Sequence, residues 1–262
     1  MDLNIITTRR SIRTFDGRPL EPEHRAQLEV FARGITNPYG IPVTFAFFDA
    51  AQNGLSSPVI TGETLYMTAK VPRAEHAEEA YGISFEKLVL AAWELGIGTT
   101  WIGGTMDRAL FERVCEVGEG EMMCCMTPLG YPAARMSLRE AAMRKGIGAD
   151  KRMDAAELFF AGDFATPLRD MEPAVADALK AVQWAPSAVN RQPWRVVRVG
   201  DDFHFFEKRD LAGGGRYRWD VQKIDVGIAV CHFMEMAGGT LSVADPGIAL
   251  PEHVEYCATV SL

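Results

Sequence analysis

The chain has 262 residues, of which 48% are hydrophobic and 24% charged, and its formal net charge is −8 at neutral pH. This length allows one large domain or two small ones, and the composition is that of a globular protein rather than a disordered or fibrous one. The acidic balance argues against a nucleic-acid or membrane-surface partner, and no apolar run reaches the roughly 18 residues of a membrane-spanning helix.

The N-terminus and the cysteines indicate a compartment. MDLNIITTRRS has an acidic second residue and too short an apolar stretch for a signal peptide. The five cysteines, at positions 115, 124, 125, 231 and 257, form no regular framework, and no CxxC pair or histidine cluster has metal-ligand spacing. We therefore expect buried, reduced thiols, a cytoplasmic protein and no bound metal.

The first predicted elements lie between residues 20 and 98. Glu21-Pro22 is typical of a helix start, and an amphipathic helix, a turn and a β-rich run at 43–48 opened by Pro42 follow it. Residues 62–70 are strand-like. Residues 83–98 have apolar residues at helical spacing and end in glycine, which predicts a long buried helix.

The same order of elements recurs later in the chain. Residues 171–199 align with 20–48 without a gap and match it at four identical positions: Glu21 with Glu172, Pro22 with Pro173, Leu28 with Leu179, and Pro42 with Pro193. Segments 200–208 and 224–239 resemble 62–70 and 83–98. We interpret this as an internal duplication with halves 1–165 and 166–262, and expect a last strand at 255–262 to complete the second sheet.

The two halves are unequal. Only the first has a basic leader, TTRRSIRTFDG, and a long tail after residue 128; only the second has APSAVNRQPW, where the first has GITNPYGIPV. Ser187 aligns with Thr36 and Asn190 with Tyr39, so each half carries a different part of a possible polar site.

Four motifs together resemble the nitroreductase family of flavin-dependent oxidoreductases. They are RRSIRTF (9–15), GIGTTWIGG (96–104), LGYPA (129–133) and APSAVNRQPW (185–194), and the resemblance covers roughly residues 5–240. The tandem arrangement is similar to the branch in which both halves are fused in one chain. The resemblance implies an α+β fold with two antiparallel sheets, central helices at 83–97 and 224–237, and one FMN at the interface of the halves. Because the two-fold contact would be internal, we expect a monomer.

The leader is the segment expected to bind the FMN phosphate. In the family an Arg-x-Ser motif binds the FMN phosphate, which implies this role for Arg9, Arg10, Ser11 and Arg13. Charge-assisted arginine contacts suit a phosphate, although a solvated basic turn would have the same composition. A basic pair of the tail completes this phosphate site in the family. Lys151-Arg152 is its counterpart here, or else a surface pair that precedes a helix.

Two further segments would contact the flavin ring. Ser187, Asn190 and Gln192 can offer donors and acceptors to N3, O2 and O4, with Trp184 and Pro186 packing the apolar faces. The alternative is an Asx-type turn that joins helix to strand. The family resemblance places the backbone of Trp101, Ile102, Gly103 and Gly104 beside flavin N5, where glycines permit close approach. A simple helix-ending turn remains the other interpretation.

The resemblance implies an FMN-dependent NAD(P)H oxidoreductase, and we expect a ping-pong mechanism on a nitroaromatic, quinone or similar small acceptor. No GxSxG or GxGxxG motif occurs, and none of the five histidines has a triad setting; His204 and His232 fit packing positions. The alternatives are a flavin-binding sensor or storage protein and a globular protein that uses the repeat only for structure. The pseudo-symmetric second site lacks the arginines and has Pro38, Tyr39 and Gly40 where the flavin ring would be held, so we expect it to bind no FMN.

Overall fold

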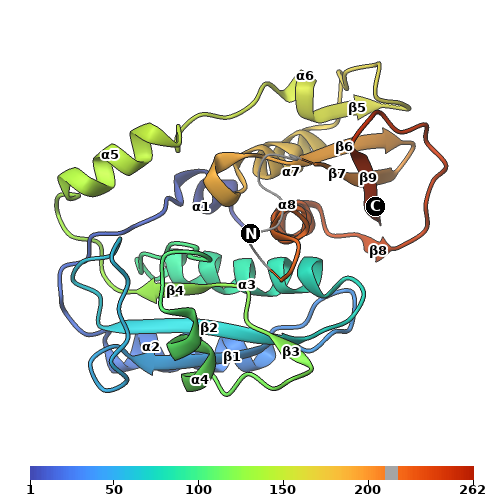
Figure 1. Ribbon diagram of the computed structural model, residues 1–262. Helices are drawn as coiled ribbons and strands as arrows, with labels where there is room; N and C mark the ends of the chain where they lie inside the picture. Colours follow the sequence, from blue (N-terminus) through green and yellow to red (C-terminus); the bar gives the residue numbers. More distant parts are fainter. Residues whose placement is uncertain (210–217) are drawn as a thin grey trace. The chain divides into compact units, whose positions relative to one another are not determined.

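The computed structural model describes residues 1–209 and 218–262, which form two compact units. The N-terminal unit comprises residues 8–77 and 84–148, and the C-terminal unit comprises residues 1–7, 78–83 and 149–262. Both contain helices and a sheet (Figure 1). The expected division at residue 165 differs from this grouping. Residues 149–165 belong with the C-terminal unit because their strand, β5, pairs with β6 of that unit.

The N-terminal unit is built around a sheet of four strands. Antiparallel pairs join β2 to β1, to β4 and to the two-residue β3. Its elements are α2 (Pro22–Gly34), β1 (Thr44–Asp49), β2 (Leu65–Pro72), most of α3 (Ala77–Glu94), α4 (Arg108–Val114), β3 (Glu121–Met122), β4 (Met126–Leu129) and α5 (Leu138–Gly146). As predicted, α2 has proline in its first turn, and it buries Leu28 and Ala32. The ring of Phe85 on α3 lies 6.1 Å from that of Phe45 on β1.

The C-terminal unit contains a five-stranded sheet in the order β5-β6-β7-β9-β8. Its elements are α1 (Leu3–Thr8, except Thr8), α6 (Ala155–Leu158), β5 (Phe159–Ala161), α7 (Pro173–Trp184), the 3-10 turn η1 (Ala188–Asn190), β6 (Trp194–Val199), β7 (Asp202–Lys208), α8 (Val221–Ala237), β8 (Thr240–Ser242) and β9 (Val254–Ser261). The predicted last strand is confirmed as β9, which lies inside the sheet between β7 and β8. The predicted antiparallel pairing is found between β6, β7, β9 and β8, and β5 adds a short parallel strand beside β6.

The two long helices were predicted from their apolar sequences. In α8 every residue from Ile224 to Phe233 is buried, as expected of a helix that is apolar on all sides. α3 begins at Ala77, six residues before the predicted start. Its first turns pack closely on α8: a Cβ at Gly82 would clash with the carbonyl oxygen of Ile224, and one at Gly227 would clash with that of Glu79. Glycine is required there because the helix backbones approach so closely.

Histidines and cysteines occupy the positions expected of packing residues. His204 and His232 are buried, with Nδ1 atoms 2.8 Å from Thr259 Oγ1 and 2.9 Å from the Ala181 carbonyl. All five cysteines are buried. Among the described residues, no helix combines the length and the hydropathy that crossing a membrane requires.

Candidate functional site

The leader and the glycine-rich segment meet in the N-terminal unit. Ser11 forms a parallel bridge with Thr99, and the N–H of Ile12 donates to the Thr99 carbonyl at 2.8 Å. A Cβ at Gly98 would lie 2.8 Å from the side chain of Ile12, so glycine permits this approach. Two motifs that are far apart in sequence therefore share one region.

Two arginines of the leader have buried guanidinium nitrogens without hydrogen-bond partners among the described residues. Arg9 is 6% exposed and Arg13 is half-buried. In each, Nε and Nη1 are buried and have no hydrogen-bond partner among the described residues. Burial lowers the pKa of both guanidinium groups, opposed by Glu86 at Arg9 and by Glu140 at Arg13. Burying cationic donors without a hydrogen bond costs free energy, so these two side chains are suited to bind an anion. Arg10 is exposed.

Two charged neighbours of the arginines were not predicted. Glu86, fully buried on α3, lies 3.7 Å from Arg9 and accepts a 2.9 Å hydrogen bond from Trp101 Nε1. It links the candidate phosphate site to the glycine-rich segment. Arg144 of α5 donates to the Ser11 carbonyl at 3.3 Å, and its charge contributes to lowering the pKa of both leader arginines. A lone acid inside the apolar stretch ISFEKLVL was the available signal for Glu86.

The glycine-rich segment offers backbone donors. The N–H of Ile102 is taken up by the Met126 carbonyl at 2.9 Å. Within the described part of the chain, the N–H groups of Gly103 and Gly104 have no hydrogen-bond acceptor. Gly104 is exposed and Gly103 partly so. These two amides, rather than that of Ile102, can face a ligand.

The segment Ser187–Gln192, here called the ring loop, is a strained turn in the C-terminal unit. Val189, Asn190 and Gln192 have φ angles of 45°, 59° and 51°, a region that non-glycine residues rarely adopt. Ser187 Oγ accepts from the N–H of Gln192 at 2.9 Å, and Arg195 donates to the Gln192 carbonyl at 3.0 Å. Pro186 is half-buried beside the loop. Such strain is characteristic of functional sites.

The ring loop binds the basic tail. Gln192 Oε1 accepts from the N–H of Met153 at 2.9 Å, and Asn190 Nδ2 donates to the Lys151 carbonyl at 3.0 Å. Gln183 donates to the Met153 carbonyl at 2.7 Å, and the Arg152 guanidinium lies 4.9 Å above the Trp184 ring. The structure thus brings Lys151 and Arg152 to the ring loop, a pairing that the sequence analysis did not predict. The side-chain amides of Gln192 and Asn190 therefore hold the tail in place, a structural role in addition to the predicted ring contacts.

The counterpart of the ring loop in the first half has different chemistry. Tyr39 stacks on His76, with ring centroids 5.2 Å apart and planes 15° from parallel. Asn37 donates to the Ile41 carbonyl and to Ser84 Oγ. The absence of FMN binding at this loop stays a prediction.

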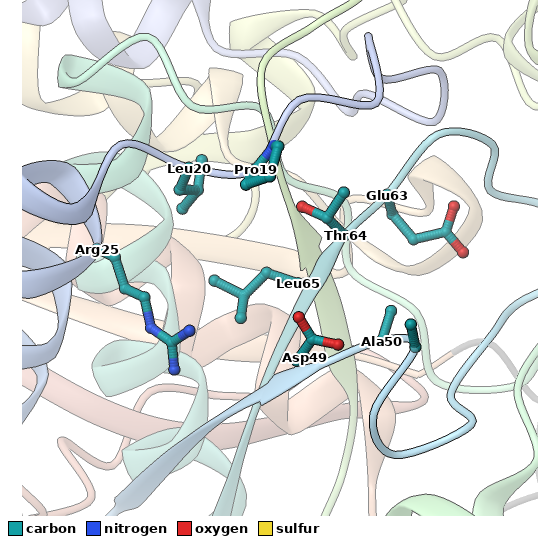
Figure 2. Close-up of a pocket in the computed structure, with 9 residues that line it drawn as sticks. Pro19, Leu20, Arg25, Asp49, Ala50, Glu63, Thr64 and Leu65 are labelled. Atoms are coloured by element: carbon teal, nitrogen blue, oxygen red, sulfur yellow. The ribbon is translucent and has the colours of Figure 1, made fainter.

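Two surface hollows of the N-terminal unit lie elsewhere. One, with a volume of about 250 Å³, is lined among others by Arg25, Asp49 and Glu63 (Figure 2). Its charged groups already have partners: Tyr66 donates to Glu63, the Gln52 N–H to Asp49, and Arg25 pairs with Glu29. The other, of about 460 Å³, lies between α2 and β1. No predicted site residue lines either hollow.

Comparison with known proteins identifies the fold class first. A structure described as a "putative nitroreductase" from Thermotoga maritima MSB8 aligns with 99% of this chain and 93% of its own length, with a TM-score of 0.63 and 18% identity. An FMN-dependent nitroreductase from Clostridium difficile R20291 aligns with 55% of this chain and 96% of its own, at 16% identity and a TM-score of 0.44. No curated protein matches the chain. The fold is α+β and nitroreductase-like.

The family follows from the sequence match. The model of the family described as "Putative TM nitroreductase" matches residues 3–237, most of the chain. The chain therefore belongs to this family of the nitroreductase superfamily.

Proposed function

We propose that this chain is an FMN-dependent NAD(P)H oxidoreductase of nitroreductase type that binds one FMN per chain. Bound FMN would supply the redox chemistry, which is hydride transfer from NAD(P)H to a small acceptor such as a nitroaromatic or a quinone. The protein contributes binding, orientation and electrostatics.

The observation that carries the proposal is the set of buried guanidinium nitrogens in Arg9 and Arg13. In each side chain Nε and Nη1 are buried and have no hydrogen-bond partner among the described residues, and Glu86 lies 3.7 Å from Arg9 Nε. A phosphate monoester, with nearly two negative charges and three acceptor oxygens, satisfies such donors. Ser11, beside them, adds a hydroxyl, and Arg144 adds positive charge nearby.

Other residues would hold the ring. The free N–H groups of Gly103 and Gly104 are candidate donors to the N5 edge, and Ser187 and Asn190 are candidates for the pyrimidine edge. Asn190 of the ring loop contacts Lys151, and Arg152 stacks on Trp184, so these two basic residues place positive charge near the ring loop. Positive charge beside the ring favours its reduced, more negative form.

Purification followed by absorbance spectroscopy tests cofactor binding. The proposal predicts a yellow protein with an FMN-like spectrum, or an apoprotein that takes up one equivalent of added FMN. A colourless chain that does not bind FMN would support a purely structural use of the repeat.

Anaerobic addition of NADH or NADPH separates the reductase from a passive flavin binder. Bleaching of the flavin, followed by reoxidation by an added quinone or nitroaromatic compound, is expected. A bound flavin that neither nucleotide reduces would favour the sensor or storage alternative.

A further inference from the structure

The ring loop has an unfavourable backbone conformation at Val189, a residue that has little packing of its own. Val189 is β-branched, has a φ of 45°, and leaves 61% of its surface exposed. Positive φ angles at three of its six residues are costly and persist only where the surroundings enforce them. The contacts that enforce this conformation are therefore of functional interest.

Two buried side chains, one at each end, fix the loop. At the C-terminal end, Arg195 donates to the carbonyl of Gln192. At the N-terminal end, the N–H of Ala188 donates to Asp225 of α8, 3.1 Å from Oδ1 and 3.0 Å from Oδ2. Both contacts lie within the C-terminal unit.

The carboxyl group of Asp225 lies where burial is unfavourable for the free energy of folding. It is 3% exposed and lies in the apolar stretch IDVGIAV of a helix that is buried on all sides. Burial, together with the charges of Asp220 and Glu207, raises its pKa well above the usual value, and the hydrogen bond from Ala188 only partly opposes this. A buried carboxyl with so little compensation does not increase the stability of the fold.

The internal repeat contains a matched contact. Ser84 of α3 is aligned with Asp225, and Asn37 is aligned with Ala188. Asn37 Nδ2 donates to Ser84 Oγ at 3.1 Å, so in both halves the first residues of the loop are tied to the same position of the long helix. Only in the half with the ring loop is the acceptor a carboxyl group.

We propose that Asp225 is a positioning residue for flavin binding, which fixes the N–H of Ala188 and thereby holds Ser187 and Asn190 in the conformation that receives the FMN ring. This inference deepens the proposed function and rests on it. Asp225 acts through the loop and does not itself contact the cofactor.

Two measurements on the full chain test the proposal. The first is hydrogen exchange of a peptide spanning residues 186–192 in the absence of FMN; the second is titration of the apoprotein with FMN. Asp225→Ala should speed exchange in this peptide and raise the dissociation constant for FMN, each by about tenfold or more, as expected when a backbone N–H loses its acceptor. Asp225→Asn retains an acceptor oxygen and should stay within about threefold of wild type.

Two further variants serve as controls. Ser84→Ala removes the matched acceptor of the first half and should change neither readout. Ala188→Pro removes only the donated N–H, since the extended backbone of Ser187 accommodates a following proline, and should reproduce the Asp225→Ala effect. It keeps the proposal testable if Asp225→Ala fails to fold.

The outcomes separate this inference from the proposed function. A folded Asp225→Ala or Ala188→Pro variant with wild-type exchange and wild-type FMN affinity overturns the positioning role. If Asp225→Asn weakens FMN binding as much as Asp225→Ala does, the hydrogen bond to Ala188 is not the cause. If the wild-type chain binds no FMN, the proposed function and the cofactor part of this inference both fail, while exchange still reports whether Asp225 holds the loop.

Discussion

The ring loop and its counterpart at residues 36–41 occupy the same place between a helix and a strand, but they differ in backbone conformation and in side-chain contacts. Each follows a helix that begins with Glu-Pro, and each leads through a proline into a strand, β6 or β1. The counterpart uses Asn37 and a Tyr39–His76 stack, whereas the ring loop is held by Asp225, Arg195 and its own Ser187. A duplicated segment can therefore keep its place between a helix and a strand while its backbone conformation and its side-chain contacts diverge: the positive φ angles of Val189, Asn190 and Gln192 have no equivalent at the aligned residues 38, 39 and 41.

The double variant Arg9→Ala/Arg13→Ala should weaken FMN binding by about a hundredfold or more. Among the described residues, each arginine has two buried donors without a hydrogen-bond partner, and each hydrogen bond to a charged group is worth roughly 1.5–3 kcal/mol. Fluorescence titration with FMN measures the effect. Arg33→Ala, at an exposed position of α2 outside the predicted site, is the control and should change affinity little. If the double variant binds FMN as tightly as wild type, Arg9 and Arg13 do not bind the phosphate.

A second contrast concerns Glu207, which is aligned with Ala69 of the first half. Glu207 is fully buried, its carboxyl oxygens have no hydrogen-bond partner among the described residues, and burial raises its pKa to about 7. The folded state then binds this proton more tightly than the unfolded state, so stability should fall as pH rises from about 4.5 through about 7.

Glu207→Gln should remove that part of the pH dependence, worth about 2–3 kcal/mol. Urea unfolding at pH 5 and pH 8 measures the difference. Equal loss of stability in variant and wild type over this range would show that Glu207 is not its source.

Gln192→Leu should release the tail from the ring loop. Its side chain is nearly buried and accepts from the N–H of Met153, so the variant leaves that donor unsatisfied at a cost of about 1–2 kcal/mol. Limited proteolysis should then cleave near residues 148–153 faster than in wild type. The control is Ile41→Ala, at the aligned position of the first half, which should leave cleavage there unchanged. A tail as resistant as that of wild type would contradict the role of this hydrogen bond.

Much of the fold could be predicted because its signals are local. Proline at the first turn located α2 and α7, and apolar periodicity located α3 and α8. The start of α3 was missed because its first turns contain Glu79 and Gly82, a buried acid and a glycine that contacts α8, which break the helical pattern. The three-residue strand β5 is too short for an alternating pattern to show.

The candidate site was predictable only in part. The motifs gave the residues of the leader and the ring loop, but not their neighbours. Met153 and Gln192 are far apart in sequence, and Glu86 contacts Arg9 through the tertiary fold alone. A single acid within an apolar helix, as at Glu86 and Asp225, was the one signal that could have indicated them.

The most direct test of the central claim compares FMN with riboflavin, which has the same ring and lacks the phosphate, in titrations of the wild-type apoprotein. If Arg9 and Arg13 bind the phosphate, FMN should bind at one equivalent per chain and about a hundredfold more tightly than riboflavin, and the Arg9→Ala/Arg13→Ala variant should lose that preference. Equal affinity of the wild-type protein for the two flavins, or binding of neither, would contradict the account.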